Sequence, residues 1–434
     1  MATAESSISL KLPLDPGLTG LVPATAENVA QALGLGRGEA MKLALAGEEV
    51  YAYLCQALPA GSSLDLVFSG HVHHVRLALT FPRANLDLRL FNLTAGCALD
   101  SQEDLAKLGL LIASRLVDES SFDQSGPDRM TLVLDKHKAY PPAEGAPAPP
   151  PVIAEAQAVT PGPAEIKELA LLLAAHFPAY AHPSDFALPG KLADMVQSGE
   201  YGLLAASDRQ GGLGGMLAWQ WGSRSIRLYG PYLFGQPDPG RLGRELVDAC
   251  LRQVAKSGAN SLVCRYSGNG LPSDQFELLG ELDLALPGGQ RRAWPHYYRQ
   301  LSEDPGAWAW CHPALRPFLE SEYRRLFLPR SIRELARQGE ARAEHSVLAA
   351  RLERGQARAT LRPVWDGADL PANLAAHVTA LRNDGFANLL MTLDTGSQWQ
   401  AGLAPELMAA GFAPRLILPG QAAGDLVVFQ HGAS

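Results

Sequence analysis

A short run of glycine, arginine and glutamate in the middle of the chain holds the residues best suited to chemistry. Gly240, Arg241, Gly243 and Arg244 follow a break rich in proline and glycine, and Glu245 comes directly after them. A loop that follows a strand and opens a helix directs backbone N–H groups and the positive end of the helix dipole at one point. Glycine allows close approach of the backbone, and arginine adds positive charge. The run therefore predicts a site for an anion such as a pyrophosphate.

The flanking residues predict the elements that would position this loop. Residues 226–234 are apolar and aromatic and predict a strand, and apolar residues at helical spacing over 241–256 predict a helix. Residues 261–266 predict a buried strand. Upstream, 201–208 and 215–222 predict two strands joined by a glycine turn, and downstream 276–280 and 294–301 predict a helix and a further element.

This order of elements resembles the GNAT family of acyl-CoA-dependent N-acyltransferases. The resemblance covers roughly residues 166–301 and rests on order and spacing. It implies acetyl-CoA or another acyl-CoA as cofactor, bound where strand 226–234 splays away from strand 261–266, and an amine on a small molecule or protein as acceptor. The cofactor-binding residues that it implies are Leu233, Phe234, Gly240, Arg241, Leu242, Gly243 and Arg244.

The catalytic groups depart from the family pattern. With the last position of the [Q/R]-x-x-G-x-[G/A] loop on Gly243, Asp238 stands at the Gln/Arg position. The usual general-acid tyrosine, counted back from Gly280, falls on Phe276, which cannot donate a proton, and one general acid contributes a factor of about 10²–10⁴. Tyr297, Tyr298 or a bound water are the alternatives. Glu245 is the candidate base, and an exposed first-turn glutamate beside the helix dipole is the simpler interpretation.

Composition limits the classes of function. The 434 residues predict two to four domains, and the net charge of −8 without a basic run argues against general nucleic-acid binding. No apolar stretch reaches membrane-spanning length, and the first residues lack a signal-peptide pattern, so we expect a cytoplasmic protein. Five cysteines without a C-x-x-C pair argue against a disulfide framework or a zinc site. Two histidines of the sequence HVHH at 71–74 share a strand face, and we interpret them as a solvated strand edge, with no metal site expected.

The first 138 residues resemble the GHKL ATP-binding fold, most closely the serine-kinase domains of anti-sigma factors. The segments that carry the resemblance are a helix at 45–55, the run 108–122 and a closing strand at 130–136, within a pattern that also predicts helices at 24–35 and 105–120 and strands at 72–79 and 86–93. The implied ligand is ATP with Mg²⁺. The residues that match the family's boxes are Glu49, Asn92, Gly96 and Gly109.

These boxes are incomplete. Tyr53 or Ala52 stands where the family has a Mg²⁺-ligating asparagine, and Mg²⁺ prefers oxygen ligands that alanine lacks. Asn92 replaces the adenine-binding aspartate, and Gly96 is the one glycine left in that box. The sequence therefore favours a degenerate ATPase fold kept as a protein-binding module.

The remainder predicts a linker, a connector and a repeat. Residues 141–163 are rich in Pro and Ala and predict an extended linker, and 302–342 predict a helical connector. Residues 343–434 resemble a second, shortened GNAT-like copy, whose general-acid position falls on Leu407. The predicted domains are thus 1–140, 141–163, 164–301, 302–342 and 343–434. The predicted class is α+β, with an N-terminal GHKL-type α/β sandwich followed by tandem GNAT-like mixed α/β domains.

Two functions follow from these patterns. The first is an acyl-CoA-dependent N-acyltransferase fused to a degenerate ATP-binding, anti-sigma-like regulatory domain. The alternative is a non-catalytic regulatory or sensor protein in which all three domains bind proteins or ligands, with a protein partner bound through the N-terminal domain. Neither function requires nucleic acid or a membrane.

Overall fold

The protein is described by a computed structural model. It covers residues 6–82, 89, 92–95, 102–123, 129–142, 147–153, 155–222, 224–286, 289–335 and 342–432, without the side chains of 102–108. The chain divides into two compact units. Unit 1 comprises Met1–Tyr140, Arg342–Ala349 and Pro363–His377, and unit 2 comprises Pro141–Ala341, Ala350–Arg362 and Val378–Ser434. The five-part division predicted from the sequence remains a prediction.

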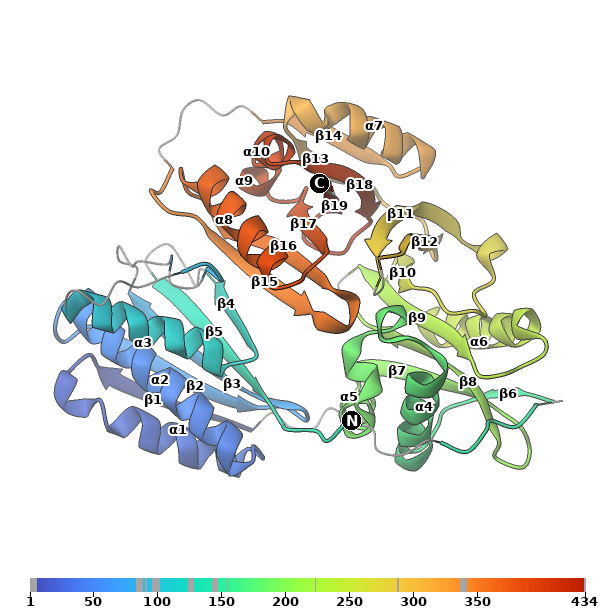
Figure 1. The fold of residues 1–434 in the computed structure, drawn as a ribbon, viewed down its shortest axis with the longest axis horizontal. Coiled ribbons are helices and arrows are strands. Elements are labelled where there is room, and N and C mark those ends of the chain that lie inside the picture. The colour runs from blue at the N-terminus through green and yellow to red at the C-terminus, as the bar shows by residue number, and fades with distance from the viewer. Residues whose placement is uncertain are drawn as a thin grey trace. The chain divides into compact units, whose positions relative to one another are not determined.

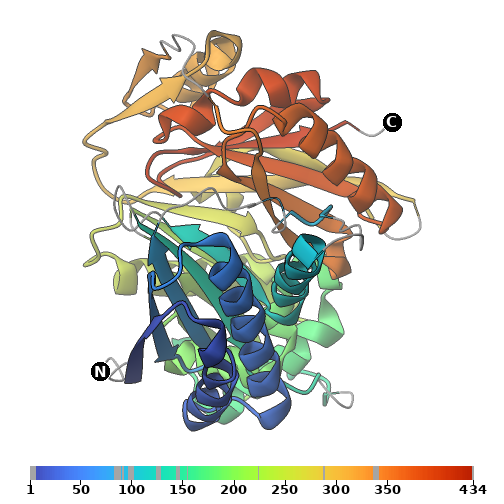
Figure 2. The same cartoon turned by 90° about the vertical axis from the view of Figure 1, so that its left-hand side faces the viewer.

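Unit 1 is a sheet covered on one face by helices (Figures 1 and 2). The strand order is β1-β2-β3-β5-β4, and every neighbouring pair is antiparallel. Along β3, alternate residues from Val75 to Phe81 are buried because strand side chains alternate between the two faces. The strands are β1 Ser6–Pro13, β2 Ser63–Gly70, β3 His74–Pro82, β4 Glu119–Asp123 and β5 Arg129–His137, and the helices are α1 Leu21–Ala32, α2 Arg37–Ala57 and α3 Gln102–Leu116.

The sequence predicted part of unit 1 correctly. The helix predicted over 105–120 is wrong at its end, because α3 stops at Leu116 and β4 begins at Glu119. The first helix begins at Leu21, ahead of the expected start beside Thr25. Strands β1 and β2 were not predicted, and most of the expected strand 86–93 lies outside the described residues. The GHKL resemblance itself remains a prediction.

Unit 2 contains a seven-stranded sheet in the order β11-β12-β10-β9-β8-β7-β6. Strands β9 and β10 are parallel and the other neighbours are antiparallel. The strands are β6 Gln157–Val159, β7 Tyr201–Ser207, β8 Leu213–Gln220, β9 Ser225–Leu233, β10 Ser261–Tyr266, β11 Glu277–Ala285 and β12 Arg291–Gln300. Helices α4 Pro163–His176, α5 Pro189–Gln197 and α6 Pro239–Val254 accompany it. The mixed α/β, multi-sheet class expected from the sequence is confirmed.

Helix α6 is the crossover between the two parallel strands, as its sequence predicts. Asp238 caps its first turn by accepting a hydrogen bond from the Arg241 N–H at 3.0 Å, and Pro239 occupies the first helical position, where no N–H is needed. Leu242, Leu246 and Cys250 face the sheet and join a buried core with Leu228 and Leu262.

A second sheet follows in the C-terminal part, in the order β15-β16-β17-β19-β18. Its strands β16 and β17 are parallel and joined by helix α8, and β19 and β18 follow as antiparallel neighbours. This is the order of β8-β9-β10-β12-β11 in the first sheet. The bounds are β15 Val347–Glu353, β16 Arg358–Trp365, α8 Leu370–Asn383, β17 Asn388–Asp394, α9 Gln398–Ala401, α10 Ala404–Ala409, β18 Phe412–Leu418 and β19 Leu426–His431.

Two side-chain amides of the C-terminal sheet cover the edge strand β11. Gln430 exchanges two hydrogen bonds with the backbone of Asp283, at 2.6 and 3.1 Å, and Asn388 exchanges two with Ala285, at 2.8 and 2.9 Å. An uncovered edge would leave backbone donors and acceptors open to other chains.

Two predictions for unit 2 are wrong. The stretch 276–280 is not a helix: a 3-10 turn at Ser273–Gln275 leads into β11, and Gly280 has a φ of 139° that a helix cannot contain. The connector is not wholly helical, because parallel strands β13 Ala307–Cys311 and β14 Arg330–Glu334 flank helix α7 Arg316–Arg325.

Candidate functional site

The parallel strands β9 and β10 separate at their carboxyl ends. Their pairing begins at Ser225 and Ser261 and ends at Tyr229 and Tyr266, with a register shift after Cys264. Beyond that point β9 continues along β8 as far as Leu233. A bulge of this kind ends pairing and re-aims the strand. The predicted splay is therefore present, beside the start of α6.

The segment that follows β10 bridges this separation. The side chain of Asn269 accepts a hydrogen bond from the Leu233 N–H at 2.9 Å and donates one to the Leu233 carbonyl at 3.0 Å. The Gly270 N–H donates to the Pro231 carbonyl at 3.2 Å. The N–H and carbonyl of Leu233, which the family resemblance implies in cofactor binding, are thus already hydrogen-bonded within the chain.

Three glycines make this approach possible. A Cβ on Gly268 would lie 1.9 Å from the Pro231 oxygen, and one on Gly243 would lie 1.7 Å from the Gly270 oxygen. The segment therefore packs directly on the first turn of α6, where the anion was expected. Phe234 is also engaged: its N–H donates to the Gly214 carbonyl at 2.9 Å and its carbonyl accepts from Gln236 at 2.8 Å.

The charged residues at the start of α6 form surface ion pairs. Arg241 lies 2.8 Å from Glu245, and Arg244 lies 2.9 Å from Asp274. The Arg244 guanidinium lowers the pKa of the Asp274 carboxyl. Exposed pairs of this kind contribute about 0–1 kcal/mol, so an incoming phosphate would compete with weak bonds only. Glu245 lies beyond the first turn of α6, where the simpler interpretation placed it, and it pairs with Arg241.

The two candidate tyrosines lie on opposite faces of β12. Tyr297 is half-buried against the core beneath α6, next to Cys264 in register, and burial raises its pKa. Tyr298 is buried on the other face, where burial raises its pKa to about 12. The structure therefore does not bring Tyr298 together with Tyr297 and Glu245. Phe276 is buried directly after the 3-10 turn and offers no proton.

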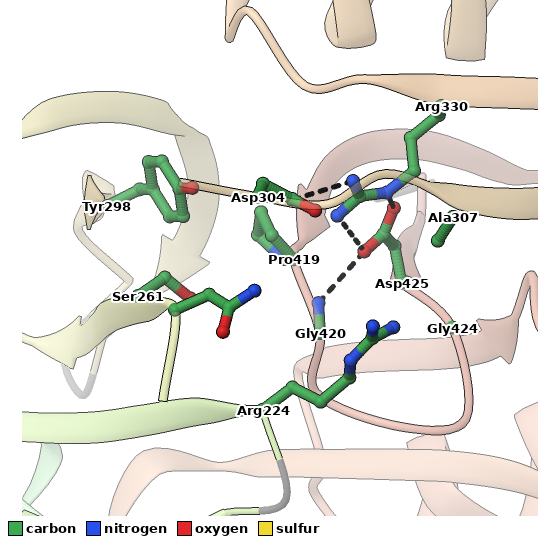
Figure 3. A pocket seen from close by; sticks show the side chains of 11 residues that line it. Arg224, Ser261, Tyr298, Asp304, Ala307, Arg330, Pro419, Gly420, Gly424 and Asp425 are labelled. Atoms are coloured by element: carbon green, nitrogen blue, oxygen red, sulfur yellow. Dashed lines mark hydrogen bonds and ion pairs between the residues drawn. The ribbon is translucent and has the colours of Figure 1, made fainter. Parts of the chain in front are cut away.

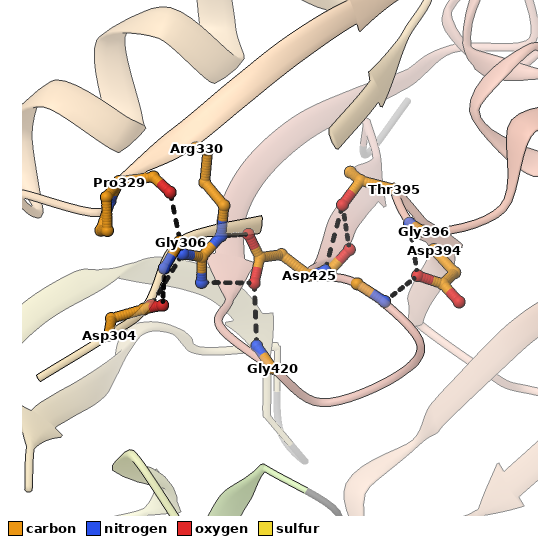
Figure 4. A network of polar contacts seen from close by, with 10 residues as sticks. Asp304, Gly306, Pro329, Arg330, Asp394, Thr395, Gly396, Gly420 and Asp425 are labelled. Atoms are coloured by element: carbon orange, nitrogen blue, oxygen red, sulfur yellow. Dashed lines mark hydrogen bonds and ion pairs between the residues drawn. The ribbon is translucent and has the colours of Figure 1, made fainter. Parts of the chain in front are cut away.

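Tyr298 instead lines a small cavity with Arg330 and Asp425 (Figure 3). Its volume is about 20 Å³, which is room for about one water molecule. Arg330 lies 2.7 Å from both Asp304 and Asp425, and Asp425 also accepts from the Gly420 N–H at 2.9 Å (Figure 4). The Arg330 and Asp425 side chains are 5% and 2% exposed, so this network is structural rather than a cofactor site.

In unit 1 the predicted ATP residues serve the fold. Asn92 is buried, accepts from the Leu348 N–H at 2.9 Å and donates to the Ser346 carbonyl at 3.0 Å. A Cβ on Gly109 would lie 2.1 Å from a carboxylate oxygen of Glu49, and burial followed by the charge of Glu48 raises the pKa of Glu49. Gly96 lies outside the described residues.

No helix in the described parts of the chain combines the length and apolar character needed to span a bilayer. No group of three or more His, Cys, Asp or Glu side chains there is arranged to hold a metal ion.

The sequence did not predict several residues that make close contacts where β9 and β10 separate. Asn269 carries no signal in a glycine-rich loop, although its glycine neighbours indicate a close backbone approach. Arg265 lies near Glu353 and Arg358 in space, although about ninety residues of sequence separate it from both, and no periodicity links them.

No protein-family model matches this chain, and no curated protein matches its sequence. Similar solved structures include a GNAT superfamily phosphinothricin acetyltransferase from Sinorhizobium meliloti in complex with AcCoA, with a TM-score of 0.27 and 15% identity over 35% of this chain and 90% of that one. A GNAT family N-acetyltransferase from Escherichia coli in complex with CoA has a TM-score of 0.25 and 18% identity over 36% and 85% of the two chains. An aminoglycoside 6'-N-acetyltransferase from Enterococcus faecium has a TM-score of 0.26 and 14% identity over 35% and 99%. Similarity of this extent leaves the function to be argued from the residues of this chain.

The buried network around Arg330 should be far more sensitive to substitution than the surface pairs of α6. Asp425→Ala removes one carboxylate from a buried guanidinium, and we expect it to lower the free energy of unfolding by about 3–5 kcal/mol. Asp274→Ala, which breaks the exposed pair with Arg244, should leave the free energy of unfolding nearly unchanged. Urea unfolding followed by tryptophan fluorescence measures both, because unit 1 contributes only Trp365. Equal losses in the two variants would contradict this ranking.

Buried His296 should make unit 2 sensitive to acid. Burial lowers its pKa to about 3, and the Arg265 guanidinium adds to the shift. Because an unfolded histidine titrates near ~6.5, the unfolded state alone gains this proton between about pH 6.5 and 3, and stability falls as the pH drops through that window. His296→Gln should flatten the dependence of the unfolding midpoint on pH, while His431→Gln should retain it. An unchanged slope in His296→Gln would exclude this cause.

Proposed function

We propose that unit 2 binds an acyl-CoA at the separation of β9 and β10 and transfers the acyl group to an amine. The observation that supports this most is the end of β9–β10 pairing at Tyr229 and Tyr266, with β9 running on to Leu233 beside the start of α6. The strand end supplies peptide groups for an amide-bearing chain, and the helix start supplies N–H groups for a phosphate.

Binding requires the segment after β10 to withdraw. The ligand's amides would replace the two hydrogen bonds that Asn269 makes to Leu233, so the number of hydrogen bonds is conserved. The main free-energy cost of the exchange is then the change in order of the loop that contains Asn269. Arg241 and Arg244 would exchange surface carboxylates for phosphate oxygens, which arginine binds well.

The proposed chemistry relies on positioning. Holding an amine against a thioester can supply most of the rate enhancement of such a reaction. Tyr297 is the candidate acid because it lies on the strand next to the point where β9 and β10 separate. It pairs with Cys264 on β10, two residues before Tyr266, the last residue of β10 that pairs with β9. Tyr298 has no role in this scheme, since it lies on the opposite face of β12.

Calorimetric titration of acetyl-CoA into the full chain tests the binding step. We expect measurable binding that Arg241→Gln combined with Arg244→Gln weakens about tenfold, which corresponds to about 1.4 kcal/mol. Arg252→Gln, at the exposed far end of α6, is the matched control and should bind as the wild type does. Tyr297→Phe should leave the affinity unchanged and slow any acyl transfer about a hundredfold. Absence of heat at millimolar acetyl-CoA would exclude this function.

A second candidate has a specific observation in its favour. If Asn269 does not release Leu233, the fold serves as a scaffold and the chain is a non-catalytic binding protein. The discriminating variant is Asn269→Ala, which frees both Leu233 peptide groups. Tighter acetyl-CoA binding by this variant supports the displacement that the acyltransferase requires, whereas no binding by either protein supports the scaffold.

We also propose that unit 1 is a protein-binding module rather than an ATPase. The side chain of Asn92, at the position of the adenine-binding aspartate, is hydrogen-bonded to the backbone of Ser346 and Leu348 instead. Titration with ATP and Mg²⁺ should therefore give no heat and no change in thermal unfolding. Asn92→Ala should lower the unfolding midpoint of unit 1, since it leaves two buried backbone groups unpaired. A saturable ATP response would overturn this assignment.

A further inference from the structure

A buried cluster in unit 2 holds more positive than negative charge. Arg265, on β10, lies beside Arg358, on β16, and the nearest carboxylate to both is Glu353, at the end of β15. The cluster lies at the point where β9 and β10 separate, because Tyr266, its neighbour, is the last paired residue of β10. Two guanidinium groups therefore face one carboxylate.

That carboxylate is committed to Arg358. The two side chains are 10% and 3% exposed, and Glu353 accepts from Arg358 at 2.6 and 2.7 Å. Glu353 also accepts from the Tyr266 hydroxyl at 3.0 Å, and Arg358 donates to the same hydroxyl. Its oxygens are thus occupied by two partners, which leaves no carboxylate for the second arginine.

Arg265 forms no direct ion pair among the described residues, although the charge of Glu353 acts on it. Its Nε is buried and has no hydrogen-bond partner in this part of the chain, whereas its carbonyl accepts from the Trp294 indole at 2.8 Å. Burial and the neighbouring Arg358 lower its pKa. A buried guanidinium nitrogen without a hydrogen-bond partner has lost its hydration, so this position favours an anionic ligand.

The other groups that surround Arg265 supply no further negative charge. His296 remains neutral, because its pKa is about 3. Tyr229 and Tyr266 present aromatic rings 6.1 Å apart, and burial raises the pKa of the Tyr229 phenol. Arg351, the other charged group near Glu353, is exposed and adds a further positive charge.

We propose that Arg265 binds an oxyanion, either the carboxylate of a small organic acid or a phosphate group. The guanidinium presents paired donors that match both groups, and the tyrosine and tryptophan rings give the site apolar walls. This site is independent of the acyl-CoA proposal, because Tyr229 and Tyr266 face away from the α6 core that contains Leu228 and Cys264.

Thermal unfolding of the full chain at constant ionic strength tests the site, with chloride replaced stepwise by succinate in one series and by inorganic phosphate in the other. We expect a saturable rise in the midpoint of the wild type. Arg265→Met should lose this rise and should match or exceed the wild-type midpoint in chloride, because it removes an uncompensated charge. Arg252→Met, whose guanidinium is exposed at the far end of α6, should keep the rise.

The outcomes separate the two sources. A rise with succinate alone assigns an organic acid, a rise with phosphate alone assigns a phosphate, and a rise with both assigns an oxyanion site of low selectivity. If Arg265→Met fails to fold, Arg265→Lys keeps the charge without the paired donors and should weaken the apparent affinity at least tenfold. Equal responses of the wild type and the Arg265 variant, or no response in either, would overturn the proposal.

Discussion

The separation of β9 from β10 is the constraint on which the rest of unit 2 depends. Once pairing stops at Tyr229 and Tyr266, the end of β9 carries peptide groups that must find partners, because an unpaired buried peptide group costs about 1–3 kcal/mol. On one side β8 supplies them, and on the other Asn269 does, with an amide that imitates a neighbouring strand. Glycine on either side of Asn269 allows the segment to approach β9 closely enough for that side chain to contact Leu233. A cofactor with amides of its own would compete for the same two bonds.

Charge is distributed differently on the two faces of the sheet. At the start of α6, arginines and carboxylates pair at the surface, where water screens them and exchange of partners is inexpensive. On the opposite face, Arg330 is buried between two aspartates and Arg358 is buried against one glutamate. Arg265 is partly exposed, forms no direct ion pair in the described part of the chain, and has a buried Nε without a hydrogen-bond partner there. The surface pairs of α6 suit a ligand that binds reversibly, and the buried pairs of Arg330 and Arg358 stabilise the fold. Arg265 is the group at which we propose a bound anion.

Local signals predicted the crossover well and the chemistry around it poorly. Helix α6 and strand β10 were predicted from apolar periodicity and from the break rich in proline and glycine before the helix, which are local signals. The stretch 276–280 failed because a short apolar run fits either a helix or an edge strand. Its strand form depends on pairing with β12 and on the amides of Gln430 and Asn388, which lie more than one hundred residues away.

The candidate site shows the same division. Gly240 and Arg241 lie on the first turn of α6, as their spacing predicts, because helix geometry is local, and Glu245 lies one turn further on. The register of β12 decides which face of the sheet Tyr297 and Tyr298 each occupy. Counting along the sequence does not give this register, and a shift by one residue would exchange the two faces. The surplus charge at Arg265 is a sum over three strands. It becomes visible only when β10, β15 and β16 are placed together, and it is the feature that most sharply separates a site for a ligand from a packed core.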